Sequence, residues 1–433
     1  MLWPTLLRLT RMVEGTSIDV YRYGFVNVDG DLVVPERYDG YQNCPDAAGR
    51  TAFVLAFAPG DKTDVLDLTG TVIARVPTQE AMCGGAGHVL AVRPVEPELG
   101  KYDDGVFDVA SGTMILALAT DRHVDVVDPG TLNVSDPGGE YFFELGTGKR
   151  TAHPGWLTTA GLESDAPAAP AAAKRTDNAP DVDSGIGFID RGGRWVVSPG
   201  LQDASAFRHG HAVIRTGGEF TFLDVGLRRV GGEWDDVEAL EVSVGSAPDL
   251  VGYQVTRDGQ QGILGPDLRV IVSPGDSEIQ CSTDAVAACA VVADDGTADL
   301  VAFPEGSLGP MPAGFSQALS RTFLADRLPA DNNAARRIYA RPGATAIELA
   351  GPSSCRGVGP DWVACEPESP PLPPVVFDAA GARAPFRTIE AVAEPSPGGG
   401  VAYYWVTAGR YQGFVDSGGA WRYRENRFAE LED

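Results

Sequence analysis

The chain has 433 residues, of which 43% are hydrophobic and 8% aromatic, and this composition excludes disorder over most of its length. The 34 Lys and Arg residues against 60 Asp and Glu residues give a formal net charge of −26. A body this acidic repels phosphate backbones and anionic lipid surfaces, so we expect neither nucleic acid nor a membrane surface as a partner.

The first eleven residues do not form a targeting segment. Arg8 and Arg11 interrupt them, and no long apolar stretch with a small-residue cleavage site follows. Elsewhere no run of apolar residues is long enough for a transmembrane helix. The absence of a signal peptide predicts a cytoplasmic protein.

Glycine and proline are frequent, with 53 and 32 residues, which favours short strands and tight turns over long helices. One pattern recurs: a strand, a polar turn, a second strand ending in an acidic or polar residue, then a glycine turn. Copies lie at 23–30, 51–70, 88–112, 123–148, 185–193, 211–226, 252–265, 289–303, 337–349, 362–378 and 401–419. Their spacing predicts about eleven units of ~39 residues, each with three or four short strands.

A small antiparallel sheet cannot bury both of its faces, whereas stacked copies provide a continuous core. We therefore predict an all-β fold, a β-propeller-like repeat array of mostly antiparallel short strands. The Ala/Pro/Asp-rich stretch 158–184 has almost no large apolar residue and is predicted as a linker. It would separate an N-terminal lobe, 18–157, of about four units from a C-terminal lobe, 185–427, of about seven. A single large ring and an open array remain alternatives.

Three units share a sharper motif. They contain Gly24-Phe-Val-Asn27, Gly187-Phe-Ile-Asp190 and Gly413-Phe-Val-Asp416, each followed by a glycine three residues later. This motif resembles the WG-repeat family, although Tyr23, Ile186, Gln261 and Gln412 stand where that family has tryptophan. The resemblance implies a β-propeller-like repeat scaffold that binds something, and it implies no reaction.

The six cysteines fall into pairs. Cys281 and Cys289, like Cys355 and Cys365, are close in sequence with Gly, Asp or Ser between, as on two sides of a hairpin. A bond between Cys44 and Cys83 would join the first two units. Three disulfides would indicate an oxidising, extracytoplasmic compartment. The alternative is that free cysteines serve as small buried hydrophobes.

The candidate catalytic residues are His209, His211 and Asp203. The two histidines alternate on a predicted strand and could converge as an acid–base or metal cluster. The competing interpretation is structural, because His88, His123 and His211 are each predicted to open the same strand of their unit.

No motif for nucleotide binding, zinc binding or nucleophilic catalysis is present. We predict no cofactor. The alternative is calcium at acidic turns, namely 27–31, 103–104, 235–236 and 294–295.

Aromatic residues gather near the C-terminus, where Tyr403, Tyr404 and Trp405 either pack in the core or form an exposed patch for a peptide or sugar. The repeat pattern without a catalytic motif favours a non-catalytic scaffold that binds a protein or peptide. The alternative is an enzyme, a hydrolase or lyase, with its site at the propeller axis.

Overall fold

The fold is all-β. The computed structural model describes residues 2–13, 16–27, 31–46, 51–85, 87–96, 98, 101–157, 164–165, 169–175, 185–243, 248–282, 288–303, 306–312, 315, 317–319, 323–326, 334–340, 346–358, 362–367, 373–391 and 403–426. In these ranges there are 41 strands and no α-helix. The prediction of an all-β chain is confirmed, and no described helix could cross a membrane.

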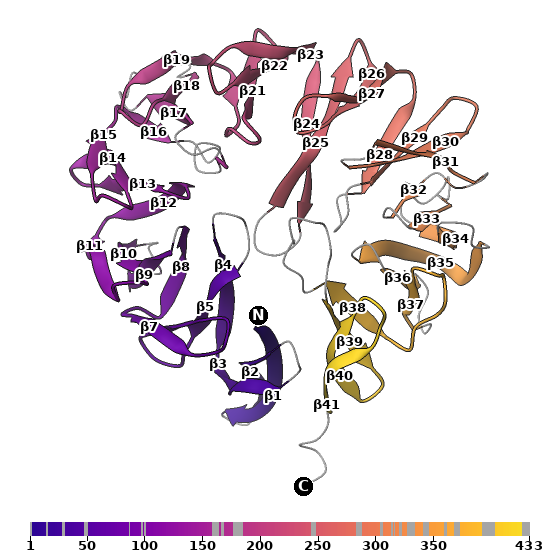
Figure 1. The fold of residues 1–433 in the computed structure, drawn as a ribbon, viewed down its shortest axis with the longest axis horizontal. Coiled ribbons are helices and arrows are strands. Elements are labelled where there is room, and N and C mark those ends of the chain that lie inside the picture. Colours follow the sequence, from indigo (N-terminus) through magenta and orange to yellow (C-terminus); the bar gives the residue numbers. More distant parts are fainter. Residues whose placement is uncertain are drawn as a thin grey trace. The chain divides into compact units, whose positions relative to one another are not determined.

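The described strands form ten antiparallel sheets, numbered 1–10 in chain order, and most of them have four strands (Figure 1). Within each sheet the strands are neighbours in the order of the sequence, as expected for repeated meanders. The predicted number of about eleven units stays a prediction.

The chain divides into two compact units, Met1–Gly232 and Glu233–Asp433, a division that differs from the predicted lobes 18–157 and 185–427. The sheets that begin in the first unit are sheet 1, β1 (Trp3–Val13), β2 (Thr16–Val26), β3 (Leu32–Tyr38); sheet 2, β4 (Gly40–Pro45), β5 (Thr51–Phe57), β6 (Thr63–Leu66), β7 (Val72–Val76); sheet 3, β8 (Glu80–Gly85), β9 (His88–Glu96), β10 (Lys101–Asp108), β11 (Thr113–Thr120); sheet 4, β12 (His123–Asp128), β13 (Thr131–Asp136), β14 (Gly139–Glu144), β15 (Arg150–Ala152); sheet 5, β16 (Gly155–Leu157), β17 (Ala171–Arg175), β18 (Ile186–Ile189), β19 (Trp195–Leu201); and sheet 6, β20 (Asp203–Ala204), β21 (His211–Thr216), β22 (Glu219–Asp224), β23 (Arg229–Trp234).

The second unit holds the remaining sheets. They are sheet 7, β24 (Asp236–Ser243), β25 (Pro248–Arg257), β26 (Gln260–Leu264), β27 (Val270–Gly275); sheet 8, β28 (Glu278–Ser282), β29 (Ala288–Val292), β30 (Ala298–Ala302), β31 (Gly306–Pro310); sheet 9, β32 (Gln317–Ala318), β33 (Phe323–Ala325), β34 (Ala334–Ala340), β35 (Ile347–Val358), β36 (Trp362–Pro367), β37 (Val375–Asp378); and sheet 10, β38 (Thr388–Ala391), β39 (Tyr403–Ala408), β40 (Tyr411–Asp416), β41 (Trp421–Asn426).

Within each unit, consecutive sheets pack face to face, since alternate residues of a strand point to opposite faces. Sheet 5 shows this arrangement clearly. Ala171 and Ala173 of β17 lie in one core cluster with Phe142 of sheet 4, whereas Ala172 between them lies in another with Phe207, which follows β20 of sheet 6. The hydrophobic interior is therefore divided into layers between sheets.

Strand β17 lies inside the range predicted as a linker. Its residues 171–173 are buried and pair with β18, and its residues 173–175 pair with β16 on the other side. Small side chains suit a strand between two packed sheets, so an alanine run that looks featureless in the sequence forms the middle of sheet 5. That part of the predicted linker is a strand.

One turn recurs in seven of the ten sheets: after the third strand of sheets 2, 3, 5, 6 and 10, after β2 in sheet 1 and at the end of β37 in sheet 9. A side-chain oxygen at its first residue, which we name the turn residue, accepts backbone N–H groups of residues two to four positions later. The turn residues are Asn27, Asp67, Asp108, Asp190, Asp224, Asp378 and Asp416. Aspartate and asparagine favour such turns because their short side chains replace a backbone acceptor.

The motif glycine permits a close approach between strands. A Cβ at Gly187 would lie 2.4 Å from the carbonyl oxygen of Val197, and one at Gly413 would lie 2.2 Å from that of Tyr423. In both sheets the register of the last two strands shifts next to this glycine. The motif therefore encodes a bulged fourth strand.

Sheet 9 has six strands because the long strand β35 is shared between the strands that precede it and the strands that follow it. Its residues Ser353 and Ser354 pair with β34 on one side and with β36 on the other. The chain thus continues from one group of strands to the next without a turn.

Each predicted cysteine pair lies at disulfide distance. Cys281 and Cys289 join neighbouring strands β28 and β29, and Cys355 and Cys365 join β35 and β36. Cys44 of β4 and Cys83 of β8 instead join sheet 2 to sheet 3. Such pairs are typical of proteins in oxidising compartments.

Candidate functional site

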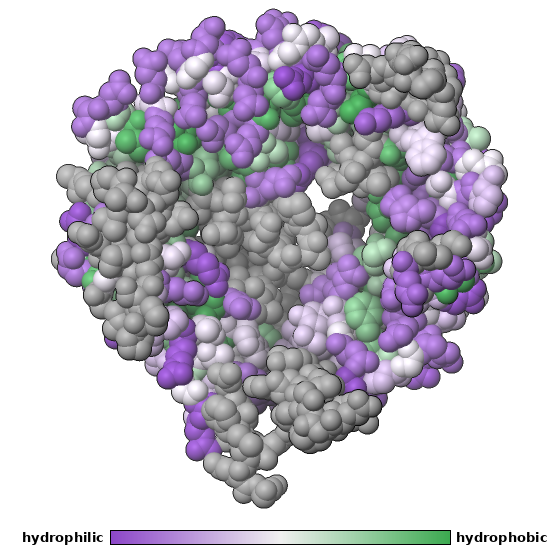
Figure 2. All heavy atoms as spheres, turned by 180° about the vertical axis from the view of Figure 1, so that it is seen from behind, coloured by the Kyte–Doolittle hydropathy of each residue, from purple (hydrophilic) through white to green (hydrophobic). Residues whose placement is uncertain are grey.

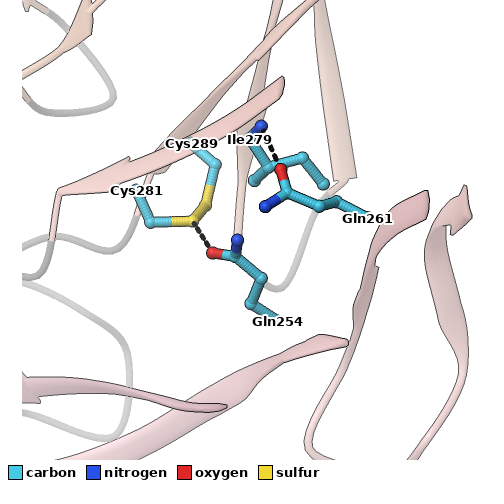
Figure 3. The surroundings of a disulfide bond; sticks show 5 residues. All are labelled: Gln254, Gln261, Ile279, Cys281 and Cys289. Carbon is cyan, nitrogen blue, oxygen red and sulfur yellow. Dashed lines mark hydrogen bonds between the residues drawn. A yellow bond between two sulfur atoms is a disulfide. The ribbon is translucent and has the colours of Figure 1, made fainter. Parts of the chain in front are cut away.

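We name the residue four positions before the turn residue the bridging residue, and in sheets 4 and 7 it is counted from Glu144 and Gly265, which take the place of the turn residue there. In several sheets it contacts the next sheet. In sheet 7 this residue is Gln261, and its Oε1 accepts the backbone N–H of Ile279 on β28 at 2.8 Å (Figure 3). Nearby, Oε1 of Gln254 lies 3.9 Å from Sγ of Cys281, so two glutamines of sheet 7 approach β28, the first strand of sheet 8.

Carboxylates do the same in sheets 3 and 4. Oδ2 of Asp104 accepts the N–H of Val124 at 3.1 Å, and the Glu140 carboxylate accepts the N–H of Leu157. In sheet 1 the bridging residue is Tyr23, whose ring lies 5.3 Å from that of Tyr41 on β4. The position that carries tryptophan in the WG motif therefore links consecutive sheets.

The bridging carboxylates belong to the largest polar cluster of the described residues, around His123 at the start of β12. Nδ1 of His123 lies 3.3 Å from Asp104, and Nε2 lies 3.1 Å from Asp125. These hydrogen bonds, the one to Asp104 first, raise the pKa of His123 to about 10. The imidazolium is thus a stable cation at pH 7, and its side chain is 70% exposed.

A buried arm of this cluster runs through sheet 4. The ring of His153 lies between the Gly155 carbonyl and Oδ1 of Asn133, each at 2.9 Å, and Nδ2 of Asn133 lies 3.5 Å from Glu140. Burial lowers the pKa of His153 to about 4 and raises that of Glu140. Since the His153 ring is neutral at pH 7, it donates from one nitrogen only.

Arg191 closes the cluster from sheet 5. Its Nε and Nη2 donate to Oδ2 of Asp128 at 3.1 and 2.9 Å, and its guanidinium lies 5.1 Å from the centre of the Phe142 ring. Phe142 in turn stacks on His153 with ring centres 4.3 Å apart. The cluster therefore ties sheets 3, 4 and 5 together.

The chemistry of this cluster suits structure better than catalysis. A general base works best with a pKa near the working pH. His123 is charged and held by two carboxylates at pH 7, whereas His153 is neutral and fully buried. Neither imidazole changes charge near neutrality.

The residues predicted from the sequence as catalytic do not come together. Asp203 pairs with Arg215, four residues along β21 from His211, a separation of about 13 Å. The backbone N–H of His209 donates to Asp165 at 3.0 Å. His211 opens the second strand of sheet 6, as His88 does in sheet 3, but His123 opens a first strand, so the prediction of one shared position is wrong for His123.

The predicted aromatic patch is divided between core and half-buried positions. Tyr404 is 0% exposed and lies in the core of sheets 9 and 10, where it cannot contact a peptide. Trp405 is half-buried and packs on Phe414 with ring centres 4.8 Å apart. The side chain of Tyr403 lies outside the described residues.

Side-chain oxygens in each predicted acidic turn have partners within the protein, and one of these segments, Asp103 and Asp104, is not a turn but part of strand β10. Oδ1 of Asn27 accepts from Asp31, and residues 28–30 between them lie outside the described ranges. Asp103 pairs with Arg93, Asp235 accepts from the N–H of Asp258, and Asp295 accepts from Thr297. Over the described part of the chain, no group of three His, Cys, Asp or Glu side chains is placed to hold a metal ion.

In the first unit, one set of exposed side chains lies near the start of the first strands. In each of sheets 3 to 6, we consider two adjacent residues near the start of the first strand. The second of the two packs on the preceding sheet, and these packing residues are Ala81, Val124, Leu157 and Ala204. The residue before it, which we name the entry residue, is exposed: Glu80, His123, Trp156 and Asp203. Trp156 is 59% exposed, the highest value among the large hydrophobic side chains described.

Figure 2 shows the hydropathy of one face of the molecule. In this view hydrophilic residues cover much of the coloured surface, and hydrophobic residues form small separate groups. An exposed tryptophan is costly to keep in water unless something covers it, and aromatic residues dominate the energy of protein interfaces.

Comparisons with known proteins support the repeat. The WG containing repeat matches residues 186–220, which span β18 to the start of β22, and the resemblance found in the sequence is confirmed there. No curated protein matches the chain.

Three solved structures have a weak similarity to this chain. A eukaryotic initiation factor is 10% identical over 84% of this chain and 92% of its own, with a TM-score of 0.39. The C-terminal WD40 domain of Sif2 is 13% identical over 72% and 92%, with a TM-score of 0.29. The β-propeller domain of the Trilobed protease from Pyrococcus furiosus is 11% identical over 72% and 92%, with a TM-score of 0.29. Values this low carry no conclusion about function.

Proposed function

We propose that this WG-repeat chain is a non-catalytic scaffold that binds a protein or peptide through the entry residues of its first unit. The observation that carries the proposal is the exposure of Trp156 at a position that recurs from sheet to sheet. Repeat scaffolds keep the packing residues alike and vary the exposed ones, which then determine the partner.

The difference between the packing residues and the entry residues before them supports separate roles for the two positions. The residues that pack on the preceding sheet are all apolar, namely Ala81, Val124, Leu157 and Ala204. The entry residues before them include two acids, a histidine and a tryptophan. Such variety is not needed for packing, and it matches the mixture of charged and aromatic groups found in interfaces.

The polar cluster supports the non-catalytic part of the proposal. Its two imidazoles titrate far from neutrality, and its carboxylates are engaged with backbone N–H groups and cations. Apart from the exposed side of His123, these groups are held between sheets and are not available to a substrate.

We propose an oxidising, extracytoplasmic location for the same scaffold. The three cysteine pairs at disulfide distance support it. Thiol counting on protein isolated from its native cells under alkylating conditions tests this part: no free thiols are expected, whereas six would contradict it.

The binding function is tested by selecting displayed random peptides on the immobilised full chain. We expect enriched peptides to bind in solution, with affinity lowered about tenfold or more by Trp156→Ala. The matched control is Val225→Ala, since Val225 is 54% exposed in a turn of sheet 6 and is not an entry residue. Failure to enrich any peptide, or equal binding by the Trp156→Ala variant, would overturn the proposal.

A further inference from the structure

Sheet 1 lacks the strand with which the other sheets of its unit begin. In sheets 2, 3, 5 and 6 the turn residue ends or follows the third strand, so each of these sheets has a first and a second strand before it. In sheet 1 the turn residue Asn27 follows β2, so β2 corresponds to a third strand and β1 to a second. Among the described strands, β1 pairs only with β2 and forms the edge of its sheet (Figure 1).

An edge strand presents unpaired backbone N–H and C=O groups along one side. β1 has eleven residues, all of which are in register with β2, so the strand is held straight along its whole length. The first strands elsewhere have at most eight residues. The edge of β1 is therefore long enough to pair with a complete first strand.

The first strands of the other sheets show what fits this place. Several of them alternate a polar, often acidic, residue with a small or aliphatic one over four residues. Examples are 123–126 (His-Val-Asp-Val), 236–239 (Asp-Val-Glu-Ala), 278–281 (Glu-Ile-Gln-Cys) and 388–391 (Thr-Ile-Glu-Ala). In three of these the first residue is exposed and the second is buried, because the strand has one face toward a neighbouring sheet.

We propose that the free edge of β1 binds an extended peptide segment, which adds to sheet 1 as an antiparallel first strand. The segment alternates acidic and aliphatic residues as the chain's own first strands do. The inference rests on the proposed function and deepens it, since it names a second place of contact and the conformation of the partner. Backbone hydrogen bonds would supply affinity, and the alternating side chains would supply specificity.

Charge supports an acidic partner at this edge. Residues 1–13 contain Arg8 and Arg11 and no acidic residue, although the whole chain carries a net charge of −26. An acidic segment is therefore attracted to this strand while most of the surface repels it, which favours one register and one place of binding.

The test uses a fluorescent peptide with the sequence of residues 236–243, Asp-Val-Glu-Ala-Leu-Glu-Val-Ser, and the full chain. The control peptide has the same composition with its apolar residues grouped, so it cannot alternate. Binding is followed by fluorescence anisotropy. We expect saturable binding of the first peptide and binding at least about tenfold weaker of the second.

Two proline variants locate the binding edge. Adjacent residues of an edge strand direct their N–H groups to opposite sides, so Leu6→Pro and Leu7→Pro remove one bond each, one toward β2 and one toward the free edge. The variant that loses the bond to β2 should unfold at a lower temperature. The other should keep the wild-type unfolding temperature and lose peptide binding by about tenfold or more.

Three outcomes would overturn the inference. They are no binding of the peptide, undiminished binding by the variant that keeps its stability, and binding that arises only after removal of residues 427–433, which would make those residues the occupant. Peptides selected as described above would still bind through Trp156 in each case, so the proposed function is judged separately.

Discussion

Cys44 of β4 and Cys83 of β8 lie on the first strands of two consecutive sheets, with their Cα atoms 5.3 Å apart. Both belong to the core between these sheets, where Cys44 is buried among Phe53, Val89 and Phe107. The other two pairs each join adjacent strands of one sheet. The three bonds therefore differ in what they hold together.

Removal of the bond between sheets should cost more stability than removal of a bond within a sheet. Loop-closure entropy gives about 4 kcal/mol for the 39-residue separation of Cys44 and Cys83, and about 2.5 kcal/mol for the separation of 8 between Cys281 and Cys289. We expect the Cys44→Ser/Cys83→Ser variant to unfold at a lower urea concentration than Cys281→Ser/Cys289→Ser. The opposite order would show that the bond within sheet 8 holds the less stable part.

Loss of the bridging amide in sheet 7 should destabilise the boundary with sheet 8. Gln261→Met keeps the shape of the side chain but leaves the N–H of Ile279 without its acceptor, at a cost of about 1–3 kcal/mol. Gln260→Met is the control, because Gln260 is an exposed neighbour that bonds only Asp276 at the surface. Equal urea midpoints for the two variants would refute a bridging role.

Substitutions in two turns should show how a positive φ affects the stability of the protein. Leu268 has a φ of 61°, a conformation that costs a non-glycine residue about 1 kcal/mol, so Leu268→Gly should raise the unfolding temperature. Gly193 has a φ of 76°, and its added Cβ would lie 2.1 Å from the carbonyl oxygen of Ala152.

Gly193→Ala should therefore cost more than Gly112→Ala, where φ is 68° and a Cβ meets no atom within 4 Å. Calorimetry on the three variants separates the cost of the conformation from that of the contact. A similar loss in both alanine variants would mean that the turn of sheet 5 can move away from sheet 4.

The contribution of His123 to stability should depend on pH. Its pKa is raised from an ordinary value of 6.5 to about 10, so its contribution is fully present below about pH 6.5 and is lost as the pH rises through about 10. The urea midpoints of wild type and His123→Gln should differ most at low pH and converge above about pH 10. A constant difference would mean that the charge of the ring does not matter.

Local chemistry explains which features the sequence predicted. The turn at Asp190 needs only residues within four positions of one another, so its acid and glycine are visible as a motif. The pairing of Cys281 with Cys289 follows in the same way from a hairpin. Antiparallel strands joined in chain order make such short-range patterns sufficient for the fold class.

The polar cluster was not predicted because its members meet across sheets. Asp104 and His123 are 19 positions apart in the sequence and come together only when sheets 3 and 4 pack. The burial of Tyr404 and the strand β17 also depend on neighbouring sheets, since neither the aromatic cluster nor the alanine run is distinctive by itself. The one local signal for the cluster is the acid four positions before the turn residue, at Asp104 and Glu140.

The shared strand β35 has a mechanical consequence. A pulling force applied along the chain reaches a turn or loop at most boundaries between sheets, where one sheet can peel off before the next. At Ser353 and Ser354 the backbone is bonded on both sides, so β34 and β36 resist through the same residues. Sheet 9 should yield in a single large step under such a load, and the strands on its two sides should be released together.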